Sequence, residues 1–338
     1  MRFGIHVGTR GCLVSRANLI ACAQRAEALG YDFIGIPDRL ILPADVATRY
    51  PYTEDGVWVG AQTGECLDVL GTLCFLAACT SRVRLLPSVL VVPYRPAIVG
   101  AKMLATIDTL SDGRLVAGVG VGWMREEFEP LNAPPVARRG AVTDEYLAAF
   151  RALWTEEAPS FQGEHVRFDN VTFRPKPVQK RIPLWVGGES QAALRRTARL
   201  GDCWYPASHN QDAPFDTPAR LRAGIDRLAR AAEAGGRDPQ SIEVALLWFK
   251  PPQWSARKTP DGARQMFTGS AADMREDVAA FEEAGLDHLI VLPQAPSIEE
   301  TLENLQRFAE AVRTPPPRPP PARGGGAGIE FPSPCGRG

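Results

Sequence analysis

The chain has 338 residues, of which 45% are hydrophobic and 23% are charged, and its 38 basic and 39 acidic residues leave a net charge of −1. This composition is typical of a globular protein and argues against wholesale disorder and against binding to a nucleic-acid backbone. No apolar run reaches the roughly 18 residues that a membrane helix needs, and the first residues enter a strand without a secretory leader. We therefore expect a cytoplasmic protein with neither a nucleic-acid nor a membrane partner.

The seven cysteines are scattered along the chain and form no C-x-x-C pair. Disulfide frameworks and structural zinc sites need closer spacing, so we expect reduced thiols and no metal centre. Motifs for P-loop nucleotide binding, zinc peptidases, α/β-hydrolases and EF-hands are absent from the sequence.

Apolar runs of strand length alternate with helical segments along the chain. Strands are expected at 3–8, 33–36, 85–92, 115–119, 182–186, 202–205, 242–249 and 288–292. Helices are expected at 16–29, 66–79, 97–110, 126–131, 142–154, 190–200, 218–234, 272–284 and 298–312. Eight alternating units fit an α/β fold of the (β/α)8 TIM-barrel type better than a doubly wound sheet.

Three segments fall outside this alternation. The irregular segment 40–65 is long for a loop in a compact domain, which favours a functional role such as a lid. Segment 161–178 predicts an inserted β-hairpin that turns at Asp169 and Asn170. After a catalytic barrel domain of residues 1–313, the Pro/Gly-rich segment 314–338 predicts a disordered tail, with a polyproline ligand as the alternative.

Candidate functional residues lie where expected strands end, because barrels bind ligands at the carboxyl ends of their strands. His6 is near the end of the first strand and is interpreted as either a mouth histidine or a core histidine. Asp38 and Arg39 follow the second strand, with a surface ion pair as the alternative. Gly120 and Gly122 belong to a G-x-G-x-G run that is one residue short of the dinucleotide fingerprint, so we expect them to let a flat ligand approach the backbone.

A second group of candidates lies between the fifth strand and its helix. Gly187, Gly188, Glu189 and Ser190 occupy a strand-to-helix junction, where free N–H groups and the helix dipole favour an anion. We interpret this junction as a phosphate site, although two glycines before a helix also ease a tight turn. Arg139 is expected either to add positive charge there or to be a solvated surface residue.

Several motifs together resemble the luciferase-like flavin and deazaflavin oxidoreductases. They are FGIHVG, YDFIGIPDRLILP, RVRLLPSVLVVPYRPAIVGAKMLATIDTLSDGRLVAGVGVGW, RRGAVTDEYLAAFRALWTE, FQGEHVRFDNVTFRPKPVQKRIPLWVGG and ALRRTARLGDCWYP. The chain is most similar to the branch that depends on coenzyme F420, a 5-deazaflavin, and the resemblance extends over about residues 1–312. It implies a (β/α)8 barrel, often a homodimer, that binds the ring of its cofactor at the carboxyl ends of the strands.

The resemblance also implies roles for individual residues. The bond between Ser88 and Val89 matches a cis peptide that supports the ring in relatives, Asp38 matches an acidic position near the ring, and Gly187 and Gly188 match the phosphate site. Arg39 and Trp123 stand where some relatives carry the histidine and glutamate proposed for sugar phosphate oxidation. That reaction is therefore not expected here.

These considerations lead to one preferred function and two alternatives. We expect an F420-dependent oxidoreductase that transfers a hydride between the deazaflavin and a small organic substrate. Arg39 would suit an anionic substrate group, and Trp58 and Trp123 would be aromatic pocket walls. The alternatives are a monooxygenase that uses O2 and reduced FMN from a separate flavin reductase, and a non-catalytic flavin-binding barrel.

Overall fold

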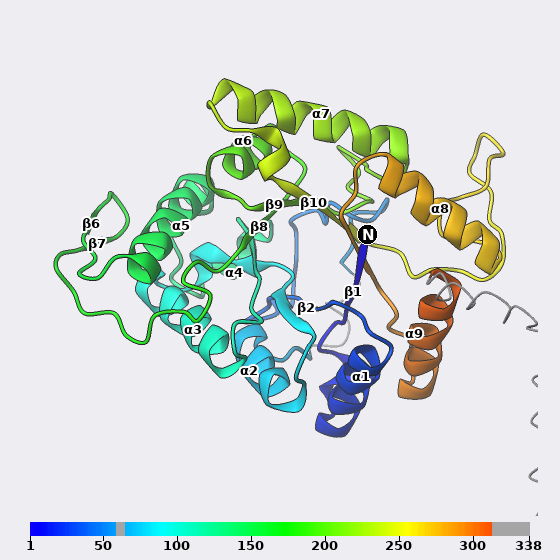
Figure 1. The fold of residues 1–338 in the computed structure, drawn as a ribbon, viewed down its shortest axis with the longest axis horizontal. Coiled ribbons are helices and arrows are strands. Elements are labelled where there is room, and N and C mark those ends of the chain that lie inside the picture. Colours follow the sequence, from blue (N-terminus) through cyan, green and yellow to red (C-terminus); the bar gives the residue numbers. More distant parts are fainter. Residues whose placement is uncertain (59–64, 313–338) are drawn as a thin grey trace, which may run out of the picture.

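The computed structural model describes residues 1–58 and 65–312. Within these ranges the chain forms one ring of parallel strands surrounded by helices, as Figure 1 shows. Residues 59–64 of the irregular segment and the expected tail, 314–338, lie outside the described residues. The domain boundary predicted at residue 313 therefore stays a prediction.

The strands pair in parallel in the order β3-β2-β1-β11-β10-β9-β8-β5-β4. Their bounds are β1 Arg2–His6, β2 Phe33–Ile36, β3 Arg84–Pro87, β4 Leu90–Val91, β5 Ala117–Gly120, β8 Leu184–Gly187, β9 Cys203–Tyr205, β10 Glu243–Trp248 and β11 His288–Val291. Since β3 and β4 are consecutive parts of one chain segment, and Leu85 bridges to Leu115 beside β5, the ring closes. The predicted (β/α)8 barrel is confirmed.

The third strand of the barrel is interrupted, whereas the sequence predicted one continuous strand over 85–92. β3 pairs with β2, and β4 pairs with β5, so the two parts turn toward different neighbours. The break falls at the Ser88–Val89 peptide, which is cis, as the resemblance implied. An unbroken apolar run carries no local signal for such a change of partner.

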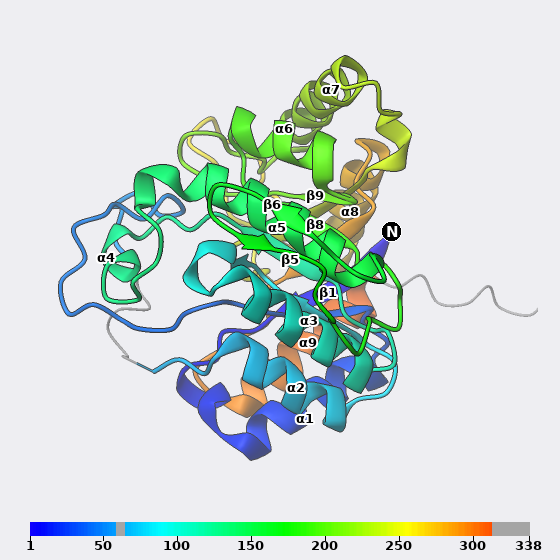
Figure 2. The same cartoon turned by 90° about the vertical axis from the view of Figure 1, so that its left-hand side faces the viewer.

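The helices lie around the outside of the strands (Figures 1 and 2). Their bounds are α1 Arg16–Ala28, α2 Val69–Cys79, α3 Ala97–Leu110, α4 Arg125–Phe128, α5 Arg139–Thr155, α6 Gln191–Leu200, α7 Pro218–Ala234, α8 Ala271–Glu283 and α9 Ile298–Val312. Short 3-10 turns occur at Gly11–Val14, Val92–Tyr94, Val136–Arg138 and Pro239–Ser241. Side-chain caps begin several helices: Ser190 accepts from the backbone N–H of Ala193 in α6, and Ser270 forms a capping box with Asp273 in α8.

The inserted hairpin is present, but its predicted turn is wrong. Its strands are β6, Phe161–Gln162, and β7, Arg167–Phe168, so the chain turns at 163–166 rather than at Asp169 and Asn170. The reason is tertiary, because the carboxylate of Glu145 on α5 accepts hydrogen bonds from three consecutive backbone N–H groups of residues 164–166. Asn170 has a positive φ of 45°, but it lies beyond β7.

Large side chains fill the interior of the barrel away from the carboxyl ends of its strands. Trp185 on β8 stacks on His288 at the start of β11, with ring centroids 4.9 Å apart, and Phe33 on β2 lies 4.8 Å from Trp185. This layer of rings closes the amino-terminal half of the barrel. The barrel interior is open at the opposite end, where the strands finish.

Some predicted absences can be checked within the described ranges. The six cysteines located there are free thiols, whereas Cys335 lies outside them. No helix among residues 1–58 and 65–312 is long and apolar enough to cross a membrane. In the same ranges, no group of three or more His, Cys, Asp or Glu side chains is arranged to hold a metal ion.

Candidate functional site

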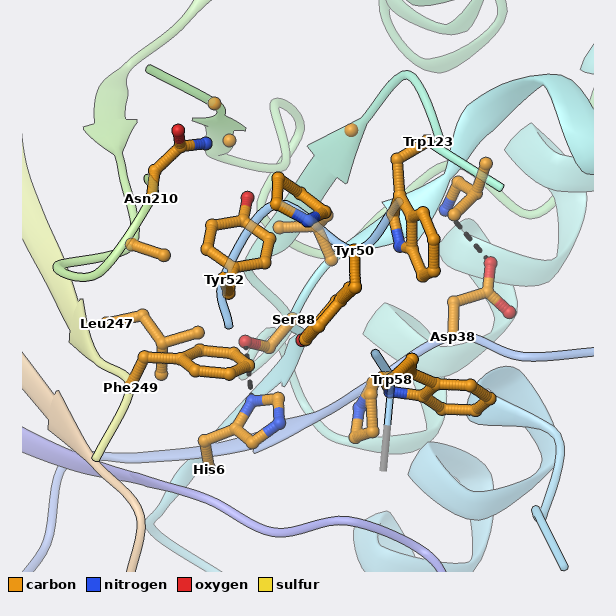
Figure 3. A pocket seen from close by; sticks show the side chains of 18 of the residues that line it. His6, Asp38, Tyr50, Tyr52, Trp58, Ser88, Trp123, Asn210, Leu247 and Phe249 are labelled. Carbon is orange, nitrogen blue, oxygen red and sulfur yellow. Dashed lines mark hydrogen bonds between the residues drawn. The ribbon is translucent and has the colours of Figure 1, made fainter. Parts of the chain in front are cut away.

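A cavity of about 670 Å³ opens at the carboxyl ends of the strands. This volume is typical of sites for small molecules and cofactors. Figure 3 shows its side chains converging from several strand ends and from the segment before residue 58. The structure brings nearly all predicted site residues to it: His6, Asp38, Arg39, Trp58, Ser88, Val89, Gly120, Gly122, Trp123, Gly187, Gly188, Glu189 and Ser190.

Val89 forms the floor of the cavity and explains two of the predicted glycines. A Cβ on Gly120 would lie 2.6 Å from Cγ2 of Val89, and a Cβ on Gly187 would lie 3.1 Å from its Cγ1. Gly122 has a φ of +82°, and a Cβ there would meet Val91 at 2.8 Å. The G-x-G-x-G run therefore accommodates the side chains that follow β3, and it forms no dinucleotide turn.

Asp38 is a buried carboxylate held on both of its oxygens. Arg95 donates two hydrogen bonds to it, at 2.7 and 2.9 Å, and the backbone N–H of Val91 donates a third at 2.9 Å. Arg95 also reaches Asp68, at 2.8 Å. The ion pair weighed for Asp38 in the sequence therefore exists, but it is buried and its partner is Arg95.

Arg39 lies between two tryptophan rings, and its charge is paired. Its guanidinium is 4.5 Å from the ring centroid of Trp58 and 4.9 Å from that of Trp123. It donates a hydrogen bond to Glu127 of α4, which is fully buried and also accepts from the hydroxyl of Tyr94 at 2.6 Å. Burial outweighs the arginine and raises the pKa of Glu127. Arg39 therefore presents a flat, neutralised surface to the cavity.

Aromatic side chains that were not predicted from the sequence extend the lining of the cavity beyond Trp123. Tyr52 stacks on Phe249 at 5.0 Å, and Tyr50 lies 5.0 Å from Trp123. The tyrosines come from the irregular segment, whose backbone N–H groups at Ala47 and Thr48 are held by Glu126 of α4. The length of that segment distinguished it in the sequence, but no periodicity marked the individual tyrosines.

The predicted phosphate junction lines the cavity, and its acidic residue is held by hydrogen bonds to the loop after β9. Gly188 has a φ of +111°, and Ser190 caps α6. The carboxylate of Glu189 accepts hydrogen bonds from the backbone N–H of Ala207 and from the side chain of Asn210, both at 2.8 Å. Burial raises the pKa of Glu189 to about 7. The backbone at 187–190 and the amino end of α6 therefore stay the candidate anion site, while Glu189 fixes the loop after β9.

The arginine predicted to reach the cavity, Arg139, does not line it, whereas Arg10, which was not predicted, does. Arg139 begins α5 and donates to the backbone carbonyl of Val136 at 2.9 Å, and it does not line the cavity. Arg10, which follows β1, does line it and forms no ion pair with the described residues. Its place just beyond a strand end was the signal that sequence reasoning passed over.

His6 is the residue of β1 that faces the cavity. Its Nδ1 lies 2.9 Å from the hydroxyl of Ser88, which in turn lies 2.8 Å from the hydroxyl of Tyr205. Burial, together with the charge of Arg10, lowers the pKa of His6 to about 4. The histidine is therefore neutral at physiological pH and belongs to the mouth of the barrel rather than to its core.

This set of residues fits a flat cofactor with a phosphate. Val89 offers an apolar floor, the aromatic walls suit a ring system, and the start of α6 suits an anion. The described lining residues include no arrangement that would hold a metal ion instead. The geometry supports a flavin-like ligand with a substrate beside it.

Comparison with known proteins gives a consistent result. A sequence model of the family described as luciferase-like monooxygenase matches residues 1–250. An uncharacterized protein of Mycobacterium bovis is 33% identical over 264 residues, which are 78% of this chain and 90% of that protein. An FMNH(2)-dependent dimethylsulfone monooxygenase of Pseudomonas fluorescens is 35% identical over 245 residues, which are 71% of this chain and 63% of that protein.

Solved structures share the fold. An F420-dependent secondary alcohol dehydrogenase, crystallised with an F420–acetone adduct, superimposes with a TM-score of 0.70. The match covers 93% of this chain and 99% of the dehydrogenase at 18% sequence identity. At that identity the similarity establishes the barrel and its order of elements.

Proposed function

We propose that this chain, which belongs to the luciferase-like monooxygenase family, is an F420-dependent oxidoreductase that transfers a hydride between the deazaflavin and a small organic substrate. The observation that carries the proposal is the cavity of about 670 Å³ at the carboxyl ends of the strands, which joins an apolar floor to the amino end of a helix. A flat ring and a phosphate need this combination at one end of a barrel. Support also comes from the F420-dependent dehydrogenase, which this chain matches over nearly its whole length.

Each wall of the cavity has a part in this proposal. Val89 supports the ring, with Gly120 and Gly187 leaving room for that side chain. The backbone of 187–190 binds the phosphate, and Arg10 adds a positive charge on the β1 side of the cavity. When bound, F420 accepts or supplies a hydride at one ring carbon, so the protein has to bind it, orient it and place the substrate beside it.

The paired charges on the β2 side of the mouth indicate whether the substrate is charged or neutral. Asp38 is saturated by Arg95 and Val91, so its role is to hold β4 beneath the ring rather than to bind a ligand. Arg39 is paired with Glu127, which removes the attraction for an anion that the sequence predicted. Together with Trp58 and Trp123 it forms an aromatic wall that suits an uncharged substrate.

A second candidate function rests on a separate observation. The relative that is 35% identical over 245 residues is an FMNH(2)-dependent monooxygenase. If this chain shares that activity, it binds reduced FMN delivered by a reductase and uses O2 as co-substrate. The cavity would suit either ring, because an apolar floor and a phosphate junction match features that both cofactors share.

Direct titration distinguishes these candidates. Purified protein is titrated with F420 and with oxidised and reduced FMN while the fluorescence of the cavity tryptophans and of the cofactor is followed. We expect micromolar affinity for F420 and at least about tenfold weaker binding of FMN, which is a difference of about 1.4 kcal/mol. Micromolar FMN affinity without F420 affinity would replace the first candidate with the second. Cofactor binding without turnover of enones, imines or alcohols would leave the non-catalytic barrel.

The assembly and location that the resemblance implies are also proposals. We propose a cytoplasmic homodimer. Sedimentation equilibrium of the purified chain gives the subunit number directly, and a monomer at micromolar concentration would reject the dimer.

A further inference from the structure

Three side chains from three different strands form a hydrogen-bonded chain that ends in the cavity. Tyr205 ends β9, Ser88 follows β3, and His6 ends β1, and the two links are 2.8 and 2.9 Å long. Figure 3 shows the second link, between Ser88 and the imidazole of His6. Tyr205 is fixed by Trp185, whose ring lies 5.5 Å away, and both hydroxyl-bearing side chains are buried. The chain is therefore a rigid feature of the barrel.

The direction of the hydrogen bonds follows from the acidity of the groups. A phenol is a stronger donor than an aliphatic hydroxyl, and burial raises the pKa of Tyr205, so this residue keeps its proton. Tyr205 then donates to Ser88, and Ser88 donates to Nδ1 of His6. A neutral imidazole that accepts at Nδ1 carries its proton on Nε2.

The other nitrogen of the imidazole is available to a ligand. Nε2 of His6 has no hydrogen-bond partner among the described residues, and the ring lines the cavity. We propose that Tyr205 and Ser88 hold His6 as the neutral Nε2–H tautomer, and that this N–H is a fixed donor to the carbonyl oxygen of an uncharged α,β-unsaturated ketone. The choice of substrate rests on the function proposed above, whereas the tautomer does not.

The donor acts on the charge that develops during reduction. The β-carbon of the ketone receives the hydride, the electrons of the C=C bond move to the carbonyl oxygen, and the α-carbon then takes a proton from water. The ketone is reduced and the cofactor is oxidised. A preorganised N–H aimed at that oxygen stabilises the negative charge as it forms. His6 is not the proton source, because losing the Nε2 proton would draw protons along the chain and leave a buried phenolate at Tyr205.

Nuclear magnetic resonance tests the tautomer without cofactor or substrate. The chain has four histidines, so the ring nitrogen signals of His6 in ¹⁵N-labelled protein are assigned by their loss in His6→Gln. At pH 7 we expect the shifts of an Nε2–H imidazole, and we expect Ser88→Ala and Tyr205→Phe to give a mixture of tautomers. An Nδ1–H tautomer or an imidazolium in the wild type would overturn the proposal, as would variants with unchanged shifts.

Kinetics test the role toward substrate, with cyclohex-2-enone and reduced F420 as the probes. Replacing His6 by Phe should lower kcat about 100-fold, the loss seen when one donor to a developing oxyanion is removed. His6→Gln retains an N–H and should recover most of that loss, while the affinity for F420 is unchanged in both variants. Undiminished kcat in His6→Phe would refute the role, and a parallel loss of F420 affinity would assign the donor to the cofactor instead. If wild-type protein binds F420 but reduces no enone, the substrate assignment is rejected and the tautomer result still stands.

Discussion

Buried carboxylates on the two sides of the barrel mouth have different partners. On the side of β2, β4 and β5, Asp38 pairs with Arg95 and Glu127 pairs with Arg39. On the side of β8 and β9, the donors to Glu189 are neutral: the backbone of Ala207, the side chain of Asn210 and, at 3.5 Å, the hydroxyl of Tyr52. The first side is therefore held by compensated charges, whereas the second holds a carboxylate that gains or loses its proton near neutral pH. The difference identifies the β2 side as a rigid wall and the β8 side as the part that responds to pH.

The largest effect should come from breaking the Asp38–Arg95 pair. Asp38→Ala leaves the guanidinium of Arg95, whose side chain is only 10% exposed, without its main partner. We expect a loss of about 3–5 kcal/mol in the free energy of unfolding in urea, as for other broken buried pairs. Asp68→Ser is the matched control, because it removes the exposed partner of Arg95 while keeping a cap for α2, and it should cost at most about 1 kcal/mol. Equal losses in the two variants would contradict a rigid, paired wall.

Glu189 should make stability depend on pH in the opposite sense to a paired carboxylate. Its pKa is raised from the ordinary 4.5 to about 7, so between these values the folded protein binds more protons than the unfolded chain. The free energy of unfolding therefore falls as pH rises through this window. We expect Glu189→Gln to remove that fall, so that the two proteins match near pH 5 and the variant is more stable by about 3 kcal/mol above pH 7. Urea unfolding from pH 5 to pH 8 measures the difference, and parallel curves would show that Glu189 is already charged when folded.

The positions of these carboxylates, but not their partners, could be predicted from the sequence. Asp38 and Glu189 stand directly after apolar runs, and strand ends meet at one face of a barrel. Their environments depend on residues far along the chain, since Arg95 lies 57 residues from Asp38, and Glu127 lies 88 residues from Arg39. A single sequence gives strand ends from local pattern, but it gives no contact between distant side chains.

The same limit explains the other differences between expectation and structure. α3 and α7 begin and end where the sequence predicted, because prolines and caps mark their ends locally. The hairpin turn was misplaced because Glu145 on α5 selects it, and the third strand was drawn unbroken because its two halves choose different neighbours. Local signals fixed the elements, and tertiary contacts decided the details within them.

A smaller loss of stability should follow when Arg39 loses its negatively charged partner, Glu127. Glu127→Gln keeps an acceptor for Tyr94 but removes the negative charge beside Arg39, at a cost of about 2 kcal/mol in unfolding free energy. The freed guanidinium should then bind benzoate in the cavity, which we expect to quench the fluorescence of Trp58 and Trp123. Glu126→Gln is the control on the same helix, because Glu126 holds the backbone at 47–48 instead. Equal benzoate affinity in the wild type and in Glu127→Gln would show that Glu127 does not neutralise Arg39.

The smallest effect on stability should come from Arg10, the cavity arginine with no ion pair among the described residues. Arg10→Met retains the apolar stem, so the free energy of unfolding should change by no more than about 0.5 kcal/mol. Binding of a phosphate-bearing flavin should nevertheless weaken about tenfold, because one charge-assisted contact is lost. Arg222→Met removes an equal charge from the exposed face of α7 and should leave that affinity unchanged.

The charge of Arg10 also lowers the pKa of His6. Arg10→Met should therefore raise the pKa of His6, which nuclear magnetic resonance detects without any ligand. A stable Arg10→Met protein with full cofactor affinity would move the phosphate away from β1 and leave the backbone at 187–190 as its sole anchor.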